Sequence, residues 1–250
     1  MEKNSPSQSL ILRTLLAADF AVQWRNRRAS ILSMLAPVVI LVSWKSIINA
    51  FGAPFALASC ITIGLIAVGL MGYANTVARD RERGVFQRLR VTPAGTTAIM
   101  TSRIIVQLVQ MMVMTIVVFI VGYFVDAIVL TPFAYVLATI VSVVCGAVFL
   151  GLAQAIVGLI SRAETVNSVT RFIYIALIVL GILGEFGTLG NAFKQAVLWS
   201  PYGTVKVVLQ AAMMPSNWGS TAWIALVVTF LYAIVFSIIG IKWFDWNSKN

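Results

Sequence analysis

The sequence contains no histidine, and only 10% of its 250 residues are charged. Histidine is the commonest acid–base group near neutral pH and a common metal ligand, so its absence removes the usual means of proton transfer and metal binding. The two cysteines, Cys60 and Cys145, lie inside apolar runs without metal-ligand spacing. Because a soluble domain carries about 25% charged residues, this inventory excludes a water-exposed globular surface.

Most of the sequence is apolar: 60% of the residues are hydrophobic, and the mean hydropathy is +0.95. A membrane-spanning helix needs roughly 20 apolar residues, and the chain is long enough for about six. Transmembrane β-strands alternate polar and apolar residues, whereas these runs are apolar on all sides. The composition therefore predicts an all-α polytopic membrane protein with six transmembrane helices.

Breaks between the apolar runs divide the chain into an N-terminal segment, residues 1–28, and a six-span domain, residues 29–250. The first segment is amphipathic and ends in a basic cluster, which predicts a helix in the headgroup region on the cytoplasmic side. Lys45 lies near the distal end of the first span, where it either snorkels to the interface or lines a pathway. The expected spans are Ala29–Phe51, Phe55–Ala78, Ala98–Val125, Phe133–Ile160, Phe172–Gly184 and Ala222–Phe244. A stripe of small residues in the fourth span, Ala147, Gly151 and Ala155, predicts close packing against another helix.

Residues 185–220 are interrupted by helix-breaking glycines and prolines, unlike the spans. Two amphipathic pieces, about Leu189–Trp199 and Thr204–Met214, are too short to cross a bilayer. Irregular backbone at membrane depth must be buried in protein or face water. The segment therefore predicts short re-entrant helices on the outer side, before the last span.

The distribution of basic residues predicts the orientation. With six spans, fifteen of the eighteen lysines and arginines lie on the side of the termini, and two, Lys194 and Lys206, lie opposite. Basic loops stay in the cytoplasm, so we expect both termini there, in a cell membrane. The net charge of +10 then reflects topology, and nucleic acid is not an expected partner.

A short charged stretch, Arg79–Pro93, separates the second and third spans. As one helix, residues 78–90 place an apolar side against protein or lipid, with Glu82 in its middle, and Pro93 ends the helix. The apolar side consists of Ala78, Val85, Phe86 and Leu89, and the opposite side carries Arg83, Gly84, Gln87 and Arg88.

Glu82 needs a partner on the apolar side, because a buried unpaired charge is costly. We expect a structural ion pair with Arg79, or with an arginine of Arg25–Arg28. The opposite side is then free to contact a partner protein. A basic loop held by anionic lipid is the alternative.

The order Arg81-Glu82-Arg83-Gly84, followed by Gln87-Arg88-Leu89-Arg90-Val91-Thr92-Pro93, resembles the loop between the second and third spans of ABC-2 type permeases. These are membrane subunits of ATP-binding-cassette exporters, including the daunorubicin-resistance type. The six-span layout and Ser200-Pro201-Tyr202-Gly203 are also similar to that family.

The resemblance implies two permease subunits, as a homodimer or a heterodimer, and two cytoplasmic ATPase subunits. The coupling helix, residues 79–93, would transmit their movement through Arg83, Gly84, Gln87 and Arg88. It also implies an outer gate in residues 185–220, with Glu185, Phe186, Pro201 and Tyr202. No G-x-x-x-x-G-K-[ST] motif occurs, so ATP and magnesium are expected on the partner, and this chain is expected to bind no cofactor or metal and to be no enzyme. The loop pattern of importer permeases is missing, which favours export.

Two other classes remain as alternatives. An ion-coupled secondary transporter or channel usually places carboxylates inside spans, whereas Asp126 and Glu185 lie near span ends. An intramembrane hydrolase would need a serine–lysine pair using Lys45. An apolar route suits a hydrophobic or amphiphilic cargo, such as a drug, a lipid-linked glycan or a peptide, and the sequence does not choose among these.

Overall fold

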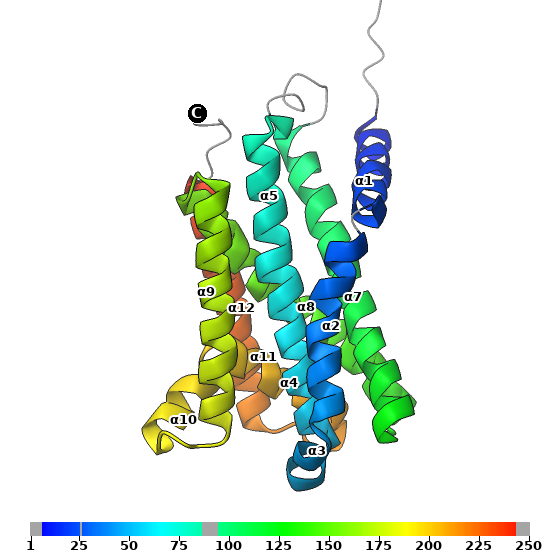
Figure 1. Cartoon of the computed structure of the whole chain (residues 1–250), viewed down its shortest axis with the longest axis vertical. Helices are drawn as coiled ribbons and strands as arrows, with labels where there is room; N and C mark the ends of the chain where they lie inside the picture. Colours follow the sequence, from blue (N-terminus) through cyan, green and yellow to red (C-terminus); the bar gives the residue numbers. More distant parts are fainter. Residues whose placement is uncertain (1–6, 26, 87–94, 244–250) are drawn as a thin grey trace, which may run out of the picture.

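The computed structural model describes residues 7–25, 27–86 and 95–243, which are helical with short connections and contain no strand. The long helices lie side by side in a bundle (Figure 1). The helices are α1 Gln8–Arg25, α2 Arg27–Ser43, α3 Lys45–Phe51, α4 Ala53–Ile66, the π-helical η1 Ala67–Gly72, α5 Tyr73–Glu82, α7 Thr96–Asp126, α8 Pro132–Leu159, α9 Ala163–Glu185, α10 Asn191–Leu198, α11 Pro201–Met213, the 3₁₀-helical η2 Pro215–Asn217, and α12 Ser220–Trp243.

The described part of the chain contains five helices long and apolar enough to cross a membrane, or six if a bent pair counts as one span. The five are α4–η1–α5 taken as one helix, α7, α8, α9 and α12. The prediction of an all-α polytopic membrane protein is therefore confirmed. We call the end of the bundle where α5 stops the loop end, and the end where α9 stops the far end (Figure 1).

The first span is not the straight helix that the sequence predicts. The helix over Met34–Ser43 and α3 meet at an angle of 68°, with the break at Trp44. Apolar character continues through the break, so hydropathy alone could not reveal the bend. Lys45 is the first residue of α3, and its side chain is exposed at the far end.

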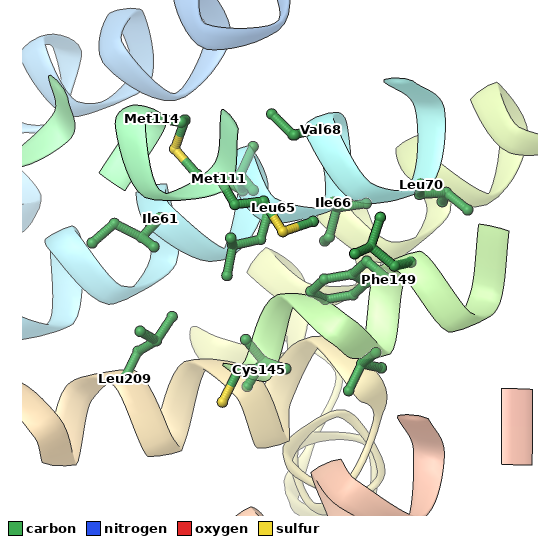
Figure 2. Packing of buried hydrophobic residues seen from close by; sticks show 14 of the residues in the cluster. Ile61, Leu65, Ile66, Val68, Leu70, Met111, Met114, Cys145, Phe149 and Leu209 are labelled. Atoms are coloured by element: carbon green, nitrogen blue, oxygen red, sulfur yellow. The ribbon is translucent and has the colours of Figure 1, made fainter. Parts of the chain in front are cut away.

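The α4–η1–α5 helix is the central element of the bundle. Its most apolar stretch is 83% buried, so other helices rather than lipid surround it. Close contact depends on Gly69, where an added Cβ would lie 2.5 Å from the Met111 Cε. Figure 2 shows Met111 of α7 reaching toward Leu65 and Ile66, with Phe149 of α8 beside them.

Helix α12 packs along α8 through small residues. A Cβ on Gly151 would lie 3.1 Å from the Ala233 carbonyl oxygen, and one on Gly158 would lie 2.9 Å from that of Gly240. Backbones approach this closely only where side chains are missing or short. The close packing predicted from Ala147, Gly151 and Ala155 is confirmed, and α12 is the partner.

Helix α1 lies beside the first half of α7 at the loop end (Figure 1). The Ser102 hydroxyl donates to the Asp19 carboxylate at 2.6 Å, and Gln23 bonds to Gln110. No side chain of α1 is buried. Its location in a headgroup layer stays a prediction.

Candidate functional site: a three-helix clamp and a buried ion pair

The last turn of α5 binds three other spans through three consecutive residues. Asp80 pairs with Arg103 of α7, Arg81 donates to the end of α8, and Glu82 accepts from the start of α9. Successive residues of an α-helix point about 100° apart, so one turn reaches neighbours on three sides. We call Asp80, Arg81 and Glu82 the three-helix clamp.

Arg81 holds the end of α8. Its Nη1 lies 2.8 Å from the Val157 carbonyl oxygen, and its Nη2 lies 2.5 Å and 2.7 Å from those of Ile160 and Ser161. The last carbonyls of a helix have no intrahelical partner and form the negative end of its dipole. Arg81, which is only 2% exposed, therefore gives these carbonyl oxygens hydrogen-bond partners and places a positive charge at the negative end of the dipole.

Glu82 has a different partner from the predicted one. The backbone amide of Ala163, the first residue of α9, donates to Glu82 Oε1 at 2.6 Å. A carboxylate is favoured there because the first amides of a helix are unpaired and partly positive. Between described side chains the ion pairs are Asp80–Arg103 and Glu185–Lys206, so Arg79, which is exposed, is not the partner of Glu82.

The chain turns sharply after the clamp. Gly84 has a φ of 66°, a left-handed conformation that glycine adopts without strain. Val85 and Phe86 are helical again, and Phe86 is fully buried. The expectation of one continuous helix over residues 78–90 is therefore wrong. Arg83 is exposed at the turn, and the predicted contact residues Gln87 and Arg88 lie outside the described residues.

An ion pair lies buried toward the far end. Lys206 Nζ of α11 is 2.8 Å from Glu185 Oε1 at the end of α9, and the two side chains are 8% and 7% exposed. Ser59 of α4 donates to Glu185 Oε2 at 3.3 Å, and Lys206 Nζ lies 3.4 Å from the Phe55 ring centroid. Burial lowers the pKa of the Lys206 amine, and the Glu185 carboxylate opposes that shift. With Tyr202, whose ring lies against Gly181 of α9, these residues form the far-end cluster.

Two further predicted residues lie around this cluster. Phe186 contacts Phe51 edge-on, with ring centroids 5.5 Å apart, and Phe51 stacks on Phe55 at 5.0 Å. Pro201 begins α11, where the Ser200 hydroxyl accepts a hydrogen bond from the Gly203 amide. The structure thus brings Glu185, Phe186, Pro201 and Tyr202 together at the junction of α9 with α10 and α11, against α3 and α4.

A profile of the ABC-2 type transporter family matches residues 11–204, a range that contains the three-helix clamp and the far-end cluster except Lys206. The chain belongs to this family. The ABC-2 chain is therefore the permease component of an ABC transporter, a membrane component that is not itself catalytic. No curated protein gave a significant match.

Several residues of this ABC-2 permease escaped the sequence reading. Asp80 and Arg81 stood in the charged stretch, and Arg103 stood beyond it, without a role, and Lys206 was counted only as an outer charge. A lysine inside the apolar run of α11 was the one signal, because a buried lysine needs an acidic partner and Glu185 is nearby in sequence. Among the described residues no group of histidine, cysteine, aspartate and glutamate could hold a metal.

Proposed function

We propose that this ABC-2 permease works in an exporter whose ATPase is a separate cytoplasmic protein. ATP and magnesium bind to that partner, and its movement enters this chain at the turn after α5. Two ATPase subunits and two permeases, identical or related, make up the transporter. The permease lies in the cell membrane, with both termini in the cytoplasm.

The three-helix clamp is the observation that supports this proposal most directly. Displacement of α5 pulls at once on α7, α8 and α9, because Asp80, Arg81 and Glu82 each bind a different one. Hydrogen bonds to charged groups contribute about 1.5–3 kcal/mol where they are buried, as those of Arg81 are. The exposed Glu82 bond is screened by solvent and contributes less, and together the three contacts resist separation. A push on the loop thus reaches the ends of several spans rather than one.

The exposed side of the same turn is the contact surface for the ATPase. Arg83 projects there, and Gly84, Gln87 and Arg88 belong to the same stretch of sequence. Arginine suits such a surface because its guanidinium binds carboxylates with two parallel hydrogen bonds.

We further propose that the far-end cluster is the outer gate. α4 contacts this cluster through Phe55 and Ser59 and is continuous with α5. One helix therefore connects the coupling turn to the gate. The cargo is hydrophobic or amphiphilic, and a drug, a lipid-linked glycan and a peptide all fit that description. Glu185 is neutralised by Lys206, so this carboxylate does not favour an ion-coupled carrier.

Co-purification tests the coupling surface. We expect the ATPase encoded beside this permease to co-purify with it, and Arg83→Glu to abolish that association through charge reversal at the contact. Arg171→Glu, at an exposed position in α9, is the matched control and should retain the ATPase. Equal loss in both variants, or full transport without any ATPase, would contradict the proposal.

A further inference from the structure

Arg103 of α7 contacts both sides of the turn that follows α5. Its Nη1 bonds to Asp80 Oδ2, before the turn, and its guanidinium carbon lies 5.3 Å from the ring centroid of Phe86, beyond it. The side chains of Arg103 and Asp80 are 12% and 20% exposed, so water reaches this pair only partly.

The left-handed Gly84 is what makes this double contact possible. It forms the turn between Glu82 and Val85, and Phe86 beyond this turn is fully buried. Asp80 and Phe86 are six residues apart, yet one side chain of another span reaches both.

We propose that Arg103 is the positioning residue of the coupling segment, the part of the chain that follows Glu82 and leads to α7: it fixes the first turn of that segment, Arg83–Phe86, relative to α5 and α7. The inference rests on the proposed function for its consequence, since a fixed segment passes partner movement into α7 as well as α5. Arg81 and Glu82 pass the same movement to α8 and α9.

The chemistry requires arginine rather than any cation. A planar guanidinium pairs with a carboxylate along its edge while its face lies over an aromatic ring. Lysine keeps the charge and can still reach Asp80, but its compact ammonium cannot do both in this geometry. Arg103→Lys and Phe86→Leu should therefore remove the same contact from its two sides while leaving charge and apolar burial in place.

Hydrogen exchange on the permease alone tests the positioning. We expect the amides of Val85 and Phe86 to exchange about fivefold faster in Arg103→Lys and in Phe86→Leu, the size expected for loss of one cation–π contact. The double variant should exchange no faster than either single variant. Arg171→Lys is the control and should match the parent. Unchanged exchange in Arg103→Lys, or additive effects in the double variant, would overturn the proposal.

Labelling of native Cys60 in the complex with the ATPase tests the consequence. Cys60 is fully buried beside Ser59 of the far-end cluster, so opening there should expose it to N-ethylmaleimide, quantified by mass spectrometry. We expect ATP with vanadate to increase its labelling in the parent, and Arg103→Lys to reduce that increase about fivefold. If ATP with vanadate does not increase Cys60 labelling in the parent, the proposed outer gate is contradicted. The hydrogen-exchange experiment then still tests whether Arg103 positions the coupling segment. If Arg103→Lys responds like the parent, Arg103 does not position the segment for coupling.

Discussion

The charged residues of this permease are placed where the backbone itself needs a partner. Arg81 binds carbonyl oxygens at the end of α8, and Glu82 binds the first amide of α9. Sequence patterns found the charged stretch but expected Glu82 to pair with an arginine, either Arg79 or one of Arg25–Arg28, because a helical projection does not show which backbone amides of other helices lie nearby. The true partner is 81 residues away in sequence, and only the tertiary structure brings it there.

At the far end, Lys206 and Glu185 form a buried ion pair. Removing one partner should strongly destabilise the permease. Lys206→Met leaves the Glu185 carboxylate buried without its counter-charge, and we expect it to lower the free energy of unfolding by about 3–5 kcal/mol. Lys206→Met combined with Glu185→Gln removes both charges and should recover much of that loss. Thermal unfolding of the purified permease measures both changes in stability. A double variant less stable than Lys206→Met alone would mean that the pair does not act as a unit.

Among the helices, length and hydropathy were enough to predict α7, α8 and α12 to within a few residues of their ends. The second span was expected over Phe55–Ala78 and extends over Ala53–Glu82, because its final turn is charged, with only Arg81 buried, and hydropathy does not count charged residues as part of a span. The bend at Trp44 and the π-helical turn Ala67–Gly72 left no trace in composition. Both are set by packing against neighbours, which hydropathy does not encode.

The contact of α8 with α12 depends on the absence of side chains at its closest points. A Cβ on Gly240 would lie 2.6 Å from the Gln154 carbonyl carbon and 2.8 Å from the Ala155 nitrogen. Gly240→Ala must therefore push the two helices apart, and we expect it to destabilise the permease by about 1–3 kcal/mol. Gly95→Ala serves as the control because its Cβ meets only the Thr97 Oγ1, at 3.7 Å. Thermal unfolding of both variants checks this, and equal stability of the two would contradict the packing argument.

For the molecule as a whole, one helix joins the two sites. The central α4–η1–α5 helix carries the three-helix clamp in its last turn and contacts the far-end cluster through Phe55 and Ser59. Sequence analysis located both regions, since the polar stretch and the broken segment stand out from the spans. It could not show that a single buried helix connects them, because an apolar sequence does not distinguish a helix surrounded by other helices from a helix that faces lipid.

The proposed mechanism requires the clamp and the far-end cluster to face opposite sides of the membrane. The bias of basic residues predicts that the loop end lies in the cytoplasm, and Arg79 at that end and Thr188 at the far end are both exposed. The native Cys60 and Cys145 are fully buried, so an introduced cysteine should dominate labelling. We expect a membrane-impermeant maleimide to label Thr188→Cys in intact cells, and Arg79→Cys only after permeabilisation. Labelling of Arg79→Cys from outside would place the coupling segment beyond the reach of any cytoplasmic ATPase and overturn the mechanism.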